Sequence, residues 1–136
     1  MGEYNHVQIR SIEHGDHMVF EITDQNFEEE VISCELPVLL DFFADWCGPC
    51  KLIEPEFERA SDMLEGRVKC GRVDTTSEKG LRIKFAAATL PMLALYREGR
   101  FVDLVDGVAS AEIIVDRVER VLAGDFDPKL ARKILQ

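Results

Sequence analysis

Cysteine chemistry is the clearest signal in this sequence, because Cys47 and Cys50 form a C-x-x-C pair within the segment Asp41–Lys51. The apolar run before the pair predicts a strand, and the residues after it predict a helix that begins at about Cys47. Residues three apart on a helix lie on one face, so the two sulfur atoms can close a small ring. Unpaired N–H groups and the helix dipole at the helix N-terminus would stabilise a thiolate on Cys47. We therefore expect Cys47 to be the nucleophile and Cys50, one turn further in and less exposed, to be the resolving cysteine.

A zinc site is the alternative use of a C-x-x-C pair. Zinc would need two more soft ligands, and Cys34 and Cys70 provide no second C-x-x-C. His14 and His17 lie three apart, but in a polar leader far from the pair. The strand expected before the pair and the helix expected after it also disfavour zinc, so we expect no metal site.

Asp41 is a second candidate for chemistry, because it lies inside the apolar run Val38–Phe43. Such a run is typical of a strand buried on both faces, and a buried carboxylate is costly to ionise. The pKa of Asp41 should then be raised. The alternative is that Asp41 lies at a solvated strand end.

Alternating strands and helices are predicted to position these residues. Hydrophobic periodicity and turn residues predict strands at 18–22, 38–43, 68–73, 92–96 and 101–105, and helices after 23, at 47–64, at 77–85 and from 110. Thr23 and Asp24 should cap the first helix and Ser110 the last, with Cys34 late in the first helix. The order β-α-β-α-β-α-β-β-α predicts an α/β fold, with a mixed central sheet covered by helices on both faces.

The composition describes a small acidic domain. The 136 residues fit one domain, and 26 acidic side chains against 16 basic ones give a net charge of −10. This balance argues against nucleic acid as a partner, because phosphate binding depends on Lys and Arg. The longest uncharged run is too short to span a bilayer, and residues 1–20 contain no apolar secretory segment. We therefore expect a cytoplasmic protein without a membrane partner. We also expect it to be a monomer.

The segment Trp46–Lys51, with the sequence WCGPCK, resembles the active site of the thioredoxin family. Further matches follow in the family's order, at Val38–Phe43, Pro55, Leu90–Pro91, Gly99 and Gly107. The resemblance covers about residues 18–122. It implies a thioredoxin domain at 18–123, between an N-terminal extension at 1–17 and a C-terminal extension at 124–136. Asp127–Pro128 also resembles the cap and first residue of a helix, so we expect a short helix in the C-terminal extension.

The resemblance implies a protein disulfide oxidoreductase with the thioredoxin fold and no bound cofactor, only a redox-active disulfide between Cys47 and Cys50. Cys47 would attack a disulfide of a protein substrate, Cys50 would resolve the mixed disulfide, and a thioredoxin reductase would return the electrons. Asp41 matches the buried acid that helps to move the proton of the resolving cysteine. Pro91 matches a cis-proline that faces the sulfur atoms. The positions implied to contact substrates are Trp46, Gly48, Pro49, Leu90, Pro91 and Gly107.

The chain departs from the family pattern at Cys70, where the family usually has Lys. The adjacent Lys69 should point to the opposite face of its strand. We therefore expect Asp41 to lack a positive neighbour, so that burial raises its pKa further. Cys34 and Cys70 are expected to be non-catalytic and to pack as small apolar side chains.

Three functions are compatible with these observations. Gly48–Pro49 between the cysteines favours a thioredoxin-type reductase over a disulfide oxidase or isomerase. The third possibility is a non-catalytic binding module with the same fold, and the presence of both cysteines argues against it.

Overall fold

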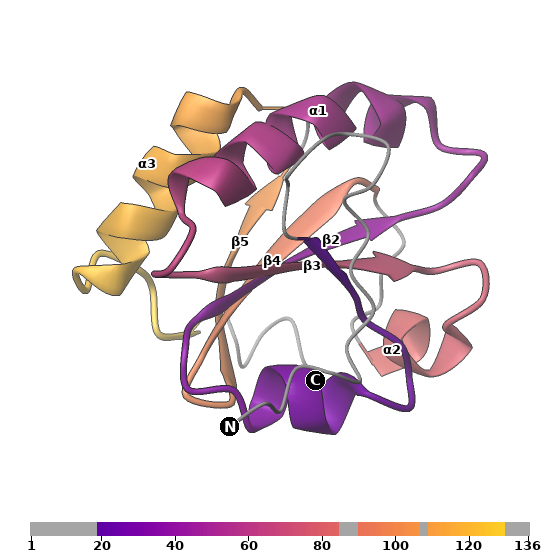
Figure 1. The fold of residues 1–136 in the computed structure, drawn as a ribbon, viewed down its shortest axis with the longest axis horizontal. Coiled ribbons are helices and arrows are strands. Elements are labelled where there is room, and N and C mark those ends of the chain that lie inside the picture. Colours follow the sequence, from indigo (N-terminus) through magenta and orange to yellow (C-terminus); the bar gives the residue numbers. More distant parts are fainter. Residues whose placement is uncertain (1–18, 85–89, 107–108, 130–136) are drawn as a thin grey trace.

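The computed structural model describes residues 19–84, 90–106 and 109–129 (Figure 1). Its strands are β1 (Val19–Glu21), β2 (Val38–Phe43), β3 (Lys69–Asp74), β4 (Met92–Arg97) and β5 (Arg100–Asp106). Its helices are the π-helix η3 (Glu28–Ile32) and the α-helices α1 (Gly48–Met63), α2 (Lys79–Lys84) and α3 (Ala111–Leu122). The elements follow each other in the predicted order.

β2 lies at the centre of a five-stranded sheet with the order β1-β3-β2-β4-β5. β3 pairs parallel with both β1 and β2, whereas β4 pairs antiparallel with β2 and β5. The predicted mixed sheet is therefore confirmed. Because β2 has a strand on each side and helices above and below, its residues are buried from Val38 to Phe42, as expected for an interior strand.

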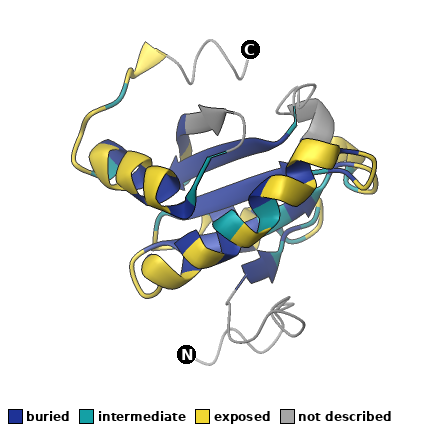
Figure 2. Ribbon diagram, turned by 90° about the horizontal axis from the view of Figure 1, so that it is seen from above, coloured by how far each residue is buried: buried dark blue, intermediate teal, exposed yellow. Residues whose placement is uncertain are grey.

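Helices cover both faces of the sheet, and the strands are buried between them (Figures 1 and 2). Leu39 belongs to the core beneath α1 and α3. Leu40 and Phe42 belong to the core on the other face, together with Val31 of η3. Side chains alternate between the two faces along a strand, so Asp41 lies on the side of Leu39, beneath α1.

The first helix differs from the prediction. It is a π-helix of five residues, and Cys34 lies beyond its end rather than late within it. The hydroxyl of Thr23 accepts a hydrogen bond from the N–H of Asn26 at 3.1 Å and caps the turn that leads into η3. The Asp24 carboxylate instead accepts hydrogen bonds from two backbone N–H groups at the start of α2. The parallel pairing of β1 with β3 explains this, because it brings the segments that follow the two strands to the same edge of the sheet.

The late hairpin and the last helix follow the predictions. Glu98 and Gly99 have positive φ angles of 54° and 78°, which suits the two central positions of a tight hairpin turn. Ser110 caps α3, since its hydroxyl accepts a backbone N–H of the first turn at 3.2 Å. Asp127 accepts a hydrogen bond from the N–H of Lys129 at 2.9 Å, but most of the short helix expected there lies outside the described residues, as does the N-terminal extension.

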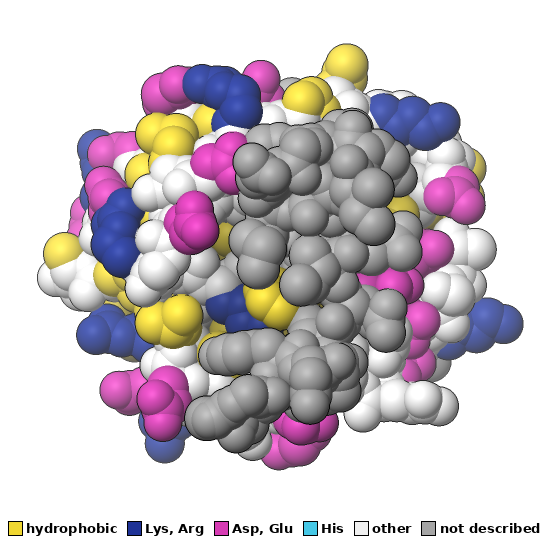
Figure 3. Space-filling model, in the orientation of Figure 1, with side chains coloured by type: hydrophobic (Ala, Val, Ile, Leu, Met, Phe, Trp, Pro, Cys, Tyr) yellow, Lys and Arg dark blue, Asp and Glu magenta, His cyan; other side chains and the backbone are white. Residues whose placement is uncertain are grey.

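The surface carries charges of both signs. On the face drawn in Figure 3, Asp and Glu side chains are interspersed with Lys and Arg, and no continuous basic patch is visible among the described residues. None of the helices in the described ranges is long and apolar enough to cross a membrane.

Candidate redox site

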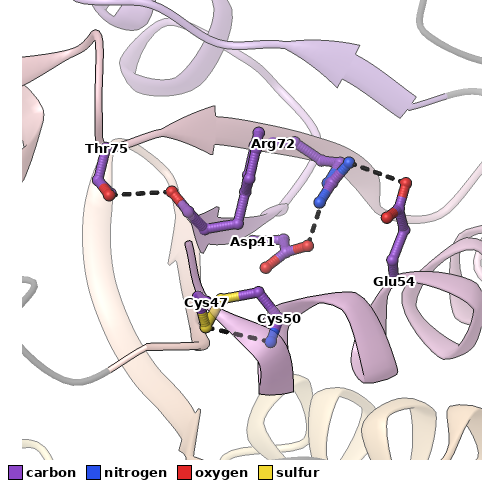
Figure 4. Close-up of polar contacts among 7 residues, drawn as sticks. Asp41, Cys47, Cys50, Glu54, Arg72 and Thr75 are labelled. Carbon is purple, nitrogen blue, oxygen red and sulfur yellow. Dashed lines mark hydrogen bonds and ion pairs between the residues drawn. A yellow bond between two sulfur atoms is a disulfide. The ribbon is translucent and has the colours of Figure 1, made fainter. Parts of the chain in front are cut away.

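Cys47 and Cys50 form a disulfide at the start of α1, shortly after the end of β2 (Figure 4). Cys47 is the N-cap residue of α1, and its sulfur accepts a hydrogen bond from the N–H of Cys50 at 3.1 Å. Pro49 lies in the first turn, where a missing N–H breaks no hydrogen bond within the helix. The pair is thus placed as predicted, at the helix end whose N–H groups stabilise a thiolate on Cys47.

The exposure of the two cysteines does not distinguish their roles. Cys47 is 4% exposed and Cys50 is 2% exposed, so both sulfur atoms are buried in the disulfide form. The assignment of nucleophile and resolving cysteine stays a prediction that depends on the helix N-terminus and the hydrogen bond to the Cys47 sulfur.

Most residues expected to contact substrates lie around this disulfide. Trp46 is 73% exposed, and Gly48 and Pro49 are exposed as well. The peptide bond between Leu90 and Pro91 is cis, as the resemblance implied. Leu90 packs against a small apolar cluster that contains both cysteines, so the segment before β4 lies beside the disulfide. Gly107 lies outside the described residues.

Asp41 is fully buried and lies between Arg72 and the cysteine pair (Figure 4). Burial raises the pKa of Asp41 from 3.8 to about 6, because loss of solvent penalises the carboxylate; Arg72 opposes this rise, and the charge of Glu54 adds to it. Within the described part of the chain, Oδ1 of Asp41 has no hydrogen-bond partner. The prediction of a buried acid with a raised pKa is confirmed, and Asp41 does not lie at a solvated strand end.

The expectation that Asp41 lacks a positive neighbour is wrong, because Arg72 pairs with it. The register of β2 and β3 places Arg72 beside Asp41, and Nε of Arg72 donates a hydrogen bond to Oδ2 of Asp41 at 3.1 Å. Nη1 of Arg72 donates to Glu54 at 3.2 Å, and the guanidinium carbon lies 4.0 Å from the centre of the Phe43 ring. Arg72 therefore supplies the positive charge beside Asp41 that was expected to be missing because Cys70 stands where the family usually has Lys.

Cys70 and Lys69 lie apart from this ion pair. Cys70 is buried in the core beneath α1 and α3, where burial raises the pKa of its thiol to about 12. Lys69 points to the opposite face, as predicted; its Nζ binds the Glu30 carboxylate at 2.5 Å and lies 4.7 Å from the centre of the Phe20 ring. Cys70 and the partly exposed Cys34 are both free thiols.

A cavity of about 300 Å³ opens beside Cys50. It is lined by residues from the ends of β2 and β3 and from the first turns of α1, namely Phe43, Ala44, Asp45, Cys50, Lys51, Glu54, Arg72 and Asp74. The guanidinium that holds Asp41 thus also forms part of an open surface next to the second cysteine. The described residues contain no group of three or more His, Cys, Asp or Glu side chains arranged to hold a metal ion.

Arg72 and Glu54 are the two site residues that the sequence patterns do not single out. Arg72 lies two residues after Cys70, so strand alternation places both on the face of β3 that is covered by α1. Glu54 lies four residues after Cys50, one turn further along the same side of α1. Both spacings can be read from the sequence, but the pairing of β3 with β2 decides which of these side chains reaches Asp41.

Comparison with known proteins agrees with this geometry. The family model Thioredoxin matches residues 18–120. A thioredoxin of Synechocystis sp. is 32% identical over 102 residues, which cover 75% of this chain and 95% of the relative. Thioredoxin C-2 of Corynebacterium nephridii is 40% identical over 87 residues, which cover 64% of this chain and 81% of the relative. Among solved structures, that of chloroplastic thioredoxin z superposes with a TM-score of 0.71 and 29% identity, over 78% of this chain and 96% of that one. The chain therefore belongs to the thioredoxin family and is a protein disulfide oxidoreductase.

Proposed function

We propose that this protein acts as a reductase of protein disulfides and that a thioredoxin reductase returns it to the dithiol form. The observation that carries the proposal is the position of the Cys47–Cys50 disulfide at the N-terminus of α1. There it lies next to the exposed Trp46 and beside the segment with the cis peptide bond before Pro91. Gly48–Pro49 between the cysteines supports the reducing direction, because this pair is the thioredoxin combination.

The reaction begins with the dithiol form, in which the Cys47 thiolate attacks one sulfur atom of a substrate disulfide. A mixed disulfide forms, and the other substrate sulfur leaves as a thiolate. Cys50 then loses its proton, and its thiolate attacks the Cys47 sulfur. The Cys47–Cys50 bond forms as the bond between Cys47 and the substrate breaks. The substrate gains two electrons, and its two thiolates take up two protons, one lost by Cys50 and one lost to solvent when the Cys47 thiol ionised. The protein is left as the disulfide.

Asp41 is the group that accepts the proton of Cys50 in this proposal. It is buried beneath α1, its Oδ1 accepts no hydrogen bond from the described residues, and burial raises its pKa to about 6. A base with a pKa close to the working pH is ionised at neutral pH and still takes up a proton readily. These properties favour Asp41 over the exposed carboxylates as the proton acceptor.

The substrate-docking surface is assigned to Trp46, Gly48, Pro49, Leu90, Pro91 and Gly107. We propose that the protein is a cytoplasmic monomer that carries electrons to disulfide substrates. The free thiols of Cys34 and Cys70 support the cytoplasmic location, because unpaired cysteines are common in reducing compartments.

Reduction of insulin, coupled to NADPH oxidation through a thioredoxin reductase, tests the proposed function. We expect sustained turnover by the natural chain and loss of turnover in Cys47→Ser, with Cys34→Ser as the matched control that retains activity. Efficient oxidation of reduced peptides with poor coupling to the reductase would instead identify an oxidase or isomerase. Binding of substrates without any turnover would identify a non-catalytic module.

A further inference from the structure

Arg72 joins three side chains around the cysteine pair. Its Nε holds Asp41 on β2, its Nη1 holds Glu54 on α1, and its guanidinium lies over the ring of Phe43. The Arg72 side chain is only 18% exposed. A planar guanidinium can make these contacts together, whereas the ammonium group of Lys is a point charge that cannot stack and bridge in the same way.

This arrangement leaves the two oxygens of Asp41 in different situations. Oδ2 accepts the hydrogen bond from Arg72 at 3.1 Å, whereas Oδ1 is buried and has no hydrogen-bond partner among the described residues. Figure 4 shows the carboxylate between Arg72 and the two cysteines. Because Arg72 fixes one oxygen, the carboxylate cannot rotate freely, and Oδ1 is the oxygen that remains to take up a proton.

Glu54 acts on the same guanidinium in the opposite sense. It lies on α1 one turn after Cys50, is about one-third exposed, and accepts the second hydrogen bond of Arg72 at 3.2 Å. Its negative charge partly neutralises Arg72 and raises the pKa of Asp41, whereas Arg72 lowers it. Other charged groups lie near Arg72. Asp45, Lys51 and Asp74 line the cavity beside Cys50 together with Arg72. A second, smaller cavity of about 90 Å³ is also lined by Arg72, and its other charged residues are Glu21, Asp74 and Glu78.

We propose that Arg72 is a positioning residue for the exchange reaction: it fixes the Asp41 carboxylate beside the cysteine pair, and Glu54 limits this hold by sharing the guanidinium. The proposal rests on the proposed role of Asp41 as the acceptor of the Cys50 proton. According to the proposal, Arg72 and Glu54 together determine the pH range over which Cys50 can resolve a mixed disulfide.

Titration of the Asp41 carboxyl carbon by NMR tests the charge balance directly. The disulfide form is the one to use, because neither cysteine titrates in it and the midpoint then belongs to Asp41. Arg72→Gln should move the midpoint upward by about one pH unit or more, the size expected for loss of a close opposite charge. Glu54→Gln should move it downward. Arg67→Gln and Glu119→Gln are matched controls, because this exposed pair binds at 2.9 Å outside the redox site, and both should leave the midpoint unchanged.

The pH profile of a single turnover tests the effect on the reaction. The reduced protein is mixed with a disulfide peptide, and the chain's only tryptophan, Trp46, serves as a fluorescent reporter beside Cys47. The profile should shift upward in Arg72→Gln and downward in Glu54→Gln. Arg72→Lys should recover only part of the Arg72→Gln shift, because it restores the charge without the planar contacts. In an Asp41→Asn background, the same substitutions should no longer shift the profile.

Unchanged Asp41 midpoints in both variants, or shifts of the same sign, would overturn the proposal even if all variants reduce insulin. A profile that still shifts in the Asp41→Asn background would also overturn it, because Arg72 would then act elsewhere. If the natural chain fails to reduce insulin, the proposed function fails, and the NMR titration still decides whether Arg72 and Glu54 control Asp41.

Discussion

Replacing Asp41 with asparagine removes a buried negative charge and keeps the shape of the side chain. Asp41 is 0% exposed, and burial raises its pKa from 3.8 to about 6. At about 1.4 kcal/mol per pH unit, ionised Asp41 lowers the free energy of unfolding by about 3 kcal/mol relative to its protonated form. Asparagine is neutral at every pH, so Asp41→Asn should stabilise the fold by up to about 3 kcal/mol at pH 8.

The pH dependence of this gain has a definite sign. In the natural chain, the folded state takes up a proton on Asp41 as the pH falls below about 6, whereas the unfolded state does so only near 3.8. The cost of the buried anion is therefore fully present above pH 6 and disappears between pH 6 and pH 3.8. The stability difference between Asp41→Asn and the natural chain should shrink to under about 1 kcal/mol at pH 4.

Urea unfolding of the disulfide form at pH 4, 6 and 8 measures this difference. Glu119→Gln is the control, since it removes a half-exposed carboxylate and should change stability little at any of these pH values. A constant difference from pH 4 to pH 8, or a loss of stability in Asp41→Asn at pH 8, would refute the reasoning. Either result would mean that Arg72 compensates the buried charge completely.

Three further predictions concern the four cysteines and the buried lysine. In the reduced protein, iodoacetamide should modify Cys47 much faster than Cys50 near neutral pH, and Cys50→Ser should trap mixed disulfides through Cys47. Mass spectrometry of the modified peptides checks both results. Faster alkylation of Cys50 would reverse the assignment of the two roles. The double substitution Cys34→Ala and Cys70→Ala should leave insulin reduction largely intact, because neither thiol is part of the disulfide, and lost turnover with an unchanged circular dichroism spectrum would contradict this. Lys69→Met should destabilise the fold by about 3 to 5 kcal/mol in urea unfolding, since it removes a cation that binds the buried Glu30 carboxylate. The double substitution Lys69→Met and Glu30→Met should recover most of that loss, and equal losses in the single and double variants would show that the charge pair is not the cause.

Local sequence determined much of this protein. The C-x-x-C pair at a strand-to-helix junction, the acid within an apolar run, and Ser110 before the last helix all depend on residues close together in the chain. Such features follow from short-range rules of helix capping, side-chain periodicity and burial. The observed elements therefore follow the predicted order, and Asp41 is buried with a raised pKa, as expected.

The tertiary structure alone decided which charges meet. Strand alternation places Cys70 and Arg72 on one face of β3, but it does not say which of them lies beside Asp41. The parallel register, with Arg72 next to Asp41 and Cys70 next to Leu39, makes that choice. In the same way, the pairing of β1 with β3 turned Asp24 from the expected cap of the first helix into the cap of α2. Both outcomes depend on contacts between residues distant in sequence, which the folded sheet fixes and local sequence patterns do not.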